Sequence, residues 1–286
     1  MKKIQLSRLT RITLLLAIFF AIDKIVAFAR IIIVARQFGL SSELDAFNVA
    51  NNLPDLLFAL ISGGALAMAF IPVLTEMLTK QGRAQAWDLF SRIANLAFLV
   101  TAVFSLLIAI FAEPLVGWRL GIAPGFGQQQ QHLVATLMRL NLFATLIFSI
   151  SGLVIAGLQA NQHFLLPALA PILYNIGQIF GAVVLAPEKG LSLGPITLPA
   201  LGLGVHGLVY GVILGALLHL AIQIPGLVRY GFRWTPKIGL NTEPVRKVLL
   251  LLGPRLLTML FIQLIFIVRD NLASRLPAGS PSALTY

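Results

Sequence analysis

The chain has 286 residues, of which 58% are hydrophobic and only 11% are charged, and its mean hydropathy is +0.92. These values exclude an ordinary soluble domain, in which about a quarter of the residues are charged. The net charge of +11 invites a nucleic-acid interpretation, but no basic stripe with interleaved aromatic residues is present. Because cysteine is absent, disulfides, thiolate metal sites and cysteine nucleophiles are excluded.

Seven apolar stretches are each long enough to cross about 30 Å of hydrocarbon. They cover approximately residues 12–35, 46–74, 89–112, 133–159, 164–186, 203–228 and 248–273. The first follows a basic N-terminus, yet it is too long and too charged for a signal peptide, so we expect a retained helix. No long soluble segment separates the stretches. The sequence therefore predicts an all-α polytopic membrane protein with about seven transmembrane helices, forming a single transmembrane unit over residues 1–286.

The first stretch carries Asp23, Lys24 and Arg30. A cation near the bilayer centre costs at least about 2.5–3.5 kcal/mol, so it normally faces protein or a wet cavity. Asp23 and Arg30 are seven residues apart and share a helix face, whereas Lys24 lies about 120° from Arg30. Two cations with one nearby acid leave positive charge available for an anionic ligand.

The second stretch contains Pro54 near one end and the pair Gly63–Gly64 midway. Proline and paired glycines loosen a helix, and such breaks are tolerated in a membrane where they line a cavity or are buried. The alternative is that the small residues only allow neighbouring helices to approach closely. Both interpretations stay open, and we treat Pro54, Gly63 and Gly64 as candidate gating residues.

The seventh stretch contains Arg255, directly after Gly253–Pro254, and the pair Arg269–Asp270. The disturbed helix makes Arg255 a candidate for a cavity, although it could equally extend to the membrane surface. Arg269 is expected to pair locally with Asp270. Isolated polar residues in the fifth and sixth stretches more often tie helices together than bind substrate; they are Tyr174, Asn175, Gln178, His206 and His219.

Lysine and arginine in the loops predict the orientation. With the N-terminus in the cytoplasm, eleven cations lie inside and four lie outside, which is a positive-inside pattern. The inner set is Lys2, Lys3, Arg8, Arg11, Lys80, Arg83, Arg229, Arg233, Lys237, Arg246 and Lys247, and the outer set is Arg36, Arg119, Lys189 and Arg275.

Enzyme motifs are missing from the sequence: there is no paired-carboxylate motif, no G-x-S-x-G, no Walker loop and no H-E-x-x-H. The ten acidic residues lie mostly in loops, and the histidines lack ligand spacing. The sequence thus favours binding and translocation over catalysis, and we expect no cofactor and no metal.

Residues 30–76 read ARIIIVARQFGLSSELDAFNVANNLPDLLFALISGGALAMAFIPVLTE. This segment resembles the N-terminal signature of the MurJ/MviN lipid II flippases, within the multidrug/oligosaccharidyl-lipid/polysaccharide exporter superfamily. The matching residues are Arg30, Arg36, Phe38, Gly39, Asp45, Ala46, Phe47, Leu53, Pro54, Leu56, Gly64, Ala65, Phe70 and Pro72. Shorter matches at residues 123–126, 164–176, 223–225 and 253–254 extend the resemblance over essentially the whole chain.

Some positions depart from the family pattern. A family arginine falls on Lys24, which keeps the charge but loses the bidentate fork. A second falls near Phe58–Ala59, and a family glutamate falls on Gly63. The family fold has two lobes, so the resemblance leads us to expect an N-terminal lobe with its seventh helix, as in a fragment.

The resemblance implies a flippase that moves lipid II across the bacterial cytoplasmic membrane by alternating access. Lys24, Arg30, Asp45 and Arg255 are then the expected substrate-binding residues, with a coupling ion or the membrane potential as the driving force and membrane lipids as neighbours. The alternatives are an exporter of another lipid-linked oligosaccharide, a drug exporter of the same superfamily, and a polyprenyl-phosphate membrane enzyme. A drug exporter for cations would need intramembrane acids, and an enzyme would need more acidic residues than this chain has.

Overall fold

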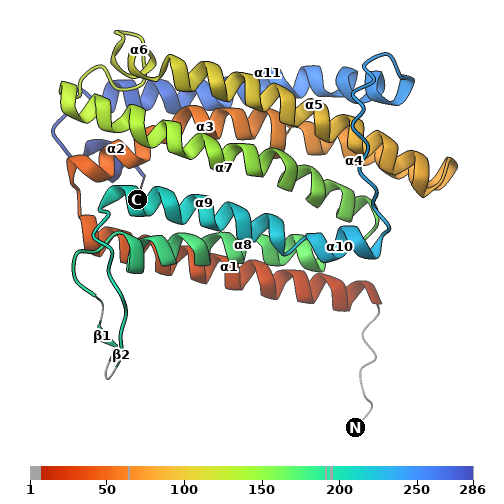
Figure 1. Ribbon diagram of the computed structural model, residues 1–286, viewed down its shortest axis with the longest axis horizontal. Helices are drawn as coiled ribbons and strands as arrows, with labels where there is room; N and C mark the ends of the chain where they lie inside the picture. Colours follow the sequence, from red (N-terminus) through yellow and green to blue (C-terminus); the bar gives the residue numbers. More distant parts are fainter. Residues whose placement is uncertain (1–7, 64, 191, 194–195, 286) are drawn as a thin grey trace.

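A computed structural model describes residues 8–63, 65–190, 192–193 and 196–285 of the chain. Its elements form a helical bundle with one very short β-hairpin (Figure 1). In chain order they are α1 (Arg8–Phe38), α2 (Ser42–Ala50), α3 (Asn52–Leu57), the π-helical η1 (Phe58–Gly63), α4 (Ala65–Lys80), α5 (Arg83–Ile110), α6 (Ala112–Gly117), α7 (Gln128–Ala160), α8 (Leu165–Phe180), the π-helical η2 (Gly181–Leu185), β1 (Ser192–Leu193), β2 (Ile196–Thr197), α9 (Val205–Ala221), α10 (Ile224–Arg229), α11 (Glu243–Ala273) and α12 (Ser280–Ala283).

The predicted transmembrane architecture is confirmed. Among the described residues, six helical segments are long and apolar enough to cross a membrane: Ser42–Lys80, Arg83–Ile110, Gln128–Ala160, Leu165–Leu185, Val205–Arg229 and Glu243–Ala273. The charged helix α1 corresponds to the first predicted stretch, and its 31 residues span about 46 Å at 1.5 Å per residue. The chain is a multi-pass helical membrane protein.

The helices form two layers (Figure 1). Helices α1, α8 and α9 lie together on one side, while α4, α5, α7 and α11 lie on the other. One apolar core lies between α4, α5, α7 and α11 around Phe70, Trp87 and Phe90. A second core joins α2, α6, α7 and α9 around Leu44, Val134 and Leu137. Large apolar side chains outside these cores are exposed along α1, α5 and α11, as expected of surfaces that face lipid.

Glycines allow α8 and η2 to pack directly against α9. A Cβ on Gly177 would lie 2.4 Å from the Cα of Gly215, and one on Gly181 would lie 2.6 Å from the Cα of Gly211. Small residues at four-residue spacing let two backbones approach this closely in a membrane, where van der Waals packing drives helix association. Close packing of α8 on α9 fixes the side chains of α8 that face α1.

The second span is interrupted, in agreement with one of the two interpretations that its sequence left open. The α2 helix ends at Ala50, four residues before Pro54, because proline fits the first turn of a new helix better than a helix interior. The π-helical turn η1 then leads to Gly63, and Gly64 lies outside the described residues. Pro54 is buried, and the break at Asn51 and the start of η1 both lie next to the cavities described below.

The connections gather at the two ends of the bundle. At one end Gln130 donates to the Ser42 carbonyl and the Gly125 amide donates to Ser274 Oγ. At the other end Trp87 donates to the Tyr230 carbonyl, and the Tyr230 hydroxyl lies 3.4 Å from Nδ1 of His163. Burial and the nearby positive charge of Arg229 lower the pKa of His163.

The connection from α10 to α11 is bound along α5. Nδ2 of Asn95 donates to the Thr235 and Lys237 carbonyls, and Nε1 of Trp234 donates to Oδ1 of Asn95. Phe232 packs edge-on against Trp87. These contacts tie the two layers together at the end of the bundle that holds most of the loop cations.

Candidate functional site in the central cavity

Three adjoining cavities lie between the two layers, and together we call them the central cavity. The first, of about 330 Å³, is lined mainly from α3, α7, α8 and α9. The second, of about 650 Å³, opens toward α11, and the third, of about 80 Å³, lies against α1. Asn51, Asp55 and Phe58 line both the first and the second, whereas Asn48 and Thr285 line both the second and the third.

Arg30 lines the part of the central cavity against α1. Its Nη1 donates a hydrogen bond to Oε1 of Gln178 on α8, so the partner is a neutral amide. One turn earlier on α8, Nδ2 of Asn175 donates to Oδ1 of Asp23 over 2.9 Å. The prediction that Asp23 and Arg30 share a helix face is therefore confirmed. The positive charge of Arg30 faces the cavity without an ion-pair partner among the described residues.

Lys24 is not brought into the central cavity. Its Nζ lies 3.3 Å from Oδ2 of Asp23, and its side chain is 79% exposed. This position agrees with the predicted angle of about 120° between Lys24 and Arg30 around α1. A direct contact between Lys24 and a ligand in the cavity stays a prediction.

Asp45 is fully buried and does not line the central cavity. Its carboxylate accepts hydrogen bonds from the backbone amides of Gly279 and Ser282, at 2.5 and 2.8 Å. These amides belong to the first turn of α12 and to the residue that precedes it. In this structure Asp45 therefore anchors the segment after α11 to α2.

Arg255 and Arg269 both lie on α11 but in different surroundings. Arg255 is half-buried, its Nη1 has no hydrogen-bond partner among the described residues, and it lines none of the three cavities. Nε of Arg269 lies 2.7 Å from Oδ1 of Asp270, which confirms the predicted local pair. Arg269 also stacks on Phe266, 5.2 Å from the ring centroid, and lines the cavity toward α11.

Asp55 is the cavity residue that sequence reasoning missed. It stands on α3 one position after Pro54, and its surface opens where two of the cavities meet. The sequence does carry a signal for it, an aspartate within an apolar stretch directly after the proline.

An amide network on α2 and α7 lies beside Asp55. Nδ2 of Asn141 donates to Oδ1 of Asn51 over 2.9 Å, and Nδ2 of Asn51 donates to the Phe47 carbonyl. Oδ1 of Asn141 is buried and accepts no hydrogen bond from the described residues. Thr145, on the next turn of α7, lines the same cavity.

His219 is oriented by a second buried network. Nδ1 of His219 lies 2.7 Å from Oγ of Ser151, and Nε2 of Gln223 donates both to that Oγ and to the His219 carbonyl. Since Gln223 donates a hydrogen bond to Oγ of Ser151, the Ser151 hydroxyl can itself donate to Nδ1 of His219. This arrangement fits a neutral His219 that carries its proton on Nε2. The His219 ring forms part of the cavity wall between α7 and α8.

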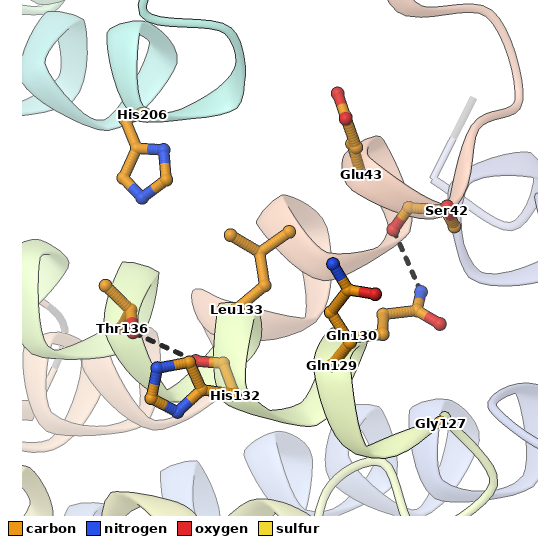
Figure 2. A pocket seen from close by; sticks show the side chains of 9 residues that line it. All are labelled: Ser42, Glu43, Gly127, Gln129, Gln130, His132, Leu133, Thr136 and His206. Carbon is orange, nitrogen blue, oxygen red and sulfur yellow. Dashed lines mark hydrogen bonds between the residues drawn. The ribbon is translucent and has the colours of Figure 1, made fainter.

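A further cavity of about 650 Å³ opens at the end of the bundle where α2, α7 and α9 begin. Figure 2 shows His206 pointing from the start of α9 toward the start of α7, where His132 and Thr136 lie. Its polar side chains are amides, hydroxyls, imidazoles and the carboxylate of Glu43. Because no lysine or arginine among the described residues lines it, this cavity is less suited to an anion than the central cavity.

The central cavity can bind an anion inside the membrane-spanning region, with arginines from α1 and α11 on its walls. The described residues contain no group of three or more histidines and carboxylates that could hold a metal ion. The geometry thus favours binding of a charged ligand over acid–base or metal chemistry.

Comparison with known proteins gives a consistent family. The family model described as "Lipid II flippase MurJ" matches residues 34–286. The "Lipid II flippase MurJ" of Burkholderia cenocepacia is 31% identical over 277 residues, which cover 94% of this chain and 50% of that protein. The "Probable lipid II flippase MurJ" of Vibrio cholerae is 29% identical over 274 residues, covering 93% of this chain and 49% of that protein.

Two solved structures share the fold. A lipid II flippase MurJ in an inward closed conformation superposes with a TM-score of 0.68 at 20% identity, over 96% of this chain and 53% of that one. An inward-facing multidrug resistance MATE family transporter of the MOP superfamily superposes with a TM-score of 0.64 at 16% identity, over 92% of this chain and 56% of that one. The chain spans about half the length of the curated relatives it matches. From the family model and the relatives together, the chain belongs to the MurJ lipid II flippase family.

Proposed function

We propose that this protein takes part in moving lipid II across the cytoplasmic membrane of a bacterium, for cell-wall synthesis. The observation that carries the proposal is Arg30, a cation inside a membrane-length helix that faces a cavity and has a neutral amide as its hydrogen-bond partner. A charge in that position is costly unless a ligand or water stabilises it. The names of the family and of the relatives support lipid II as the ligand.

The chemistry of lipid II matches the cavity. The molecule joins a polyprenyl tail, a pyrophosphate and a bulky disaccharide-peptide head. Arg30 and Arg269 offer guanidinium groups, which suit phosphate oxygens because they can donate two hydrogen bonds at once. Asn48, Asn51 and Gln263 offer amides that can bind hydroxyl and peptide groups of the head. The apolar outer faces of α1 and α11 would leave the tail in lipid.

Movement would use the interrupted second span. The α-helical hydrogen bonding is interrupted at Asn51 and again at η1, and both sites border the central cavity. Irregular backbone of this kind can change shape with few broken contacts, as in transporters that expose a site alternately to each side. Pro54, Gly63 and Gly64 remain proposed gating residues on this basis.

The alternatives receive less support. An exporter of another lipid-linked oligosaccharide would use the same cavity chemistry, but the matched family and relatives are named for lipid II. The likeness to the MATE transporter, at 16% identity, supports a common fold and no particular cargo. Catalysis on a polyprenyl phosphate would need acid–base groups beside the arginines, and the described residues that line the central cavity offer Asp55, Tyr174 and His219 but no pair of carboxylates.

The test replaces Arg30 in a bacterium depleted of its own flippase. Arg30→Ala should abolish growth, and Arg30→Lys should restore it only in part, because a point charge replaces a bidentate group. The matched control is Arg233→Ala, which removes an exposed arginine from the α10–α11 connection and should leave growth normal. Membrane fractions must contain equal amounts of each variant. Normal growth on Arg30→Ala would contradict a role for this cation in substrate binding.

A further inference from the structure

The imidazole of His219 presents its two nitrogens to different surroundings. Nδ1 lies 2.7 Å from Oγ of Ser151 and 3.4 Å from Nε2 of Gln223, which can only donate. The Gln223 amide cannot be turned over, because its oxygen would then lie 2.6 Å from the His219 carbonyl oxygen. Nδ1 of His219 is therefore an acceptor, and Nε2 carries the proton of the neutral ring.

The Nε2–H of His219 is a donor that opens into the first of the three adjoining cavities. Among the described residues no acceptor lies within hydrogen-bond distance of this nitrogen. The side chain is only 8% exposed, yet it forms part of the cavity wall. The buried, unpartnered nitrogens of the described histidines and glutamines are those of His163 and Gln178, so Nε2 of His219 reaches the cavity surface. A donor held in this way inside a membrane span needs an acceptor within the cavity.

The rest of this cavity wall is largely aromatic. Phe148 lies at its centre, with the ring centroids of Phe58, Tyr174 and His219 at 5.2, 5.1 and 5.2 Å from its own. No lysine or arginine among the described residues lines this cavity, so an anionic group is better placed in the neighbouring cavities that hold the arginines. A volume of about 330 Å³ with apolar walls and a few polar groups suits a small uncharged group.

Asp55 supplies an acceptor from a different wall of the same cavity. It stands on α3, which packs on α7 and α11, whereas His219 stands on α9 in the other layer (Figure 1). A group that bridges these walls must offer an acceptor to His219 and a donor to Asp55. A secondary amide offers both, because its C=O and N–H point in opposite directions within one plane.

We propose that this cavity binds a secondary amide of the transported molecule, with Nε2–H of His219 donating to its carbonyl oxygen and the Asp55 carboxyl group accepting from its N–H. The apolar substituent of the amide lies against Phe58 and Phe148. This inference rests on the proposed function, because the head of lipid II joins a sugar part to a peptide part. An acylated amino sugar and a peptide bond both contain the group, and the cavity chemistry suits either.

Ser151 and Gln223 act as positioning residues for this contact. They keep Nδ1 of His219 in the acceptor role and so keep the proton on Nε2. Without the Ser151 hydroxyl the ring is free to carry its proton on Nδ1 instead. Nε2 would then be an acceptor facing the carbonyl oxygen of the ligand, which is repulsive. The identity of residue 151 should therefore affect binding although its side chain does not touch the ligand.

The test measures the binding of soluble probes to the purified protein in lipid nanodiscs, by saturation-transfer NMR and without any lipid-linked substrate. N-acetylglucosamine represents the acylated sugar and is compared with glucose. N-acetylalanine methylamide represents the peptide and is compared with its diester analogue, methyl O-acetyllactate. At least one amide probe should bind about fivefold or more tightly than its partner, since a site built for an N–H rejects an analogue that lacks it. The probe with the larger preference identifies the source of the amide.

Variants of His219 assign the preference to its donor. His219→Phe keeps a ring but no donor and should abolish the preference, whereas His219→Gln places an amide N–H near the same point and should retain part of it. Ser151→Ala should reduce the preference about threefold or more. The matched control is His206→Phe, at the start of the same helix and in the wall of a different cavity, which should change nothing. Each variant must elute as a monodisperse species before reconstitution.

The proposal is overturned if neither amide probe is preferred by the unaltered protein, or if His219→Phe keeps the full preference. Loss of the preference in both His219 variants, with Ser151→Ala unchanged, would indicate a purely structural role for the ring and would also overturn it. Because probe binding is measured without transport or growth, its failure is distinguishable from failure of the proposed function.

Discussion

Several charged side chains inside the spans form hydrogen bonds with partners of three different kinds. Asp23 and Asp270 accept from asparagine amides, Asp45 accepts from backbone amides, and Arg30 donates to a glutamine. The shared face of Asp23 and Arg30 could be predicted from their seven-residue spacing. The partner of Arg30 could not, because Gln178 lies 148 residues away and only the packing of α1 on α8 brings them together.

The partners of Asp45 are also distant in the sequence and could not be predicted. The family signature suggested a substrate contact, whereas in the structure the Asp45 carboxylate binds backbone amides at α12. Asp45→Ala would leave two buried amides without acceptors, at a cost of about 1–3 kcal/mol each. The variant should therefore unfold at a lower temperature in detergent, with Asp45→Asn in between. Glu43→Ala, on the exposed face of the same helix, is the control. An unchanged melting temperature for Asp45→Ala would refute the anchoring role.

Among the elements, apolar length predicted the six membrane-length segments and α1, and the interruption of the second span agrees with one of the two interpretations of Pro54 and Gly63–Gly64. The sequence did not predict where that interruption falls or its π-helical form, because these depend on how η1 packs against α7. It also did not identify the glycine contact between α8 and α9. That contact depends on the register of two helices, which a pattern within one helix does not contain.

The glycine contact predicts a sharp difference between two glycines of equal helix propensity. A Cβ on Gly211 would lie 2.7 Å from the Cα of Gly181, whereas a Cβ on Gly253 in α11 meets nothing within 4 Å. Gly211→Val should thus force α8 and α9 apart, at a cost of about 1–3 kcal/mol for overpacking. Gly253→Val should be tolerated. Thermal denaturation in detergent, followed by loss of the monodisperse species, measures both. Equal melting temperatures would show that the close packing of α8 on α9 contributes little to stability.

At the scale of the whole molecule, the alternation of long helices brings every second connection to the same end of the bundle. The connections around residues 81–82, 161–164 and 230–242 meet at one end, and those around 39–41, 118–127 and 274–279 meet at the other. Loop cations are concentrated at the first of these ends. The sequence therefore contains the information for orientation in its charge distribution, although the fold alone has no inside or outside.

Single cysteines can test the predicted orientation, because the 286 residues contain no cysteine of their own. Gln129 and Lys189 are exposed at one end of the bundle, and Gln81 and Arg233 are exposed at the other. With a cytoplasmic N-terminus, a membrane-impermeant maleimide added to intact spheroplasts should label Gln129→Cys and Lys189→Cys. Gln81→Cys and Arg233→Cys should react only after the membrane is permeabilised. Labelling of the second pair and not the first in intact spheroplasts would contradict the predicted orientation. It would show that the cation-rich end of the bundle lies outside the cell.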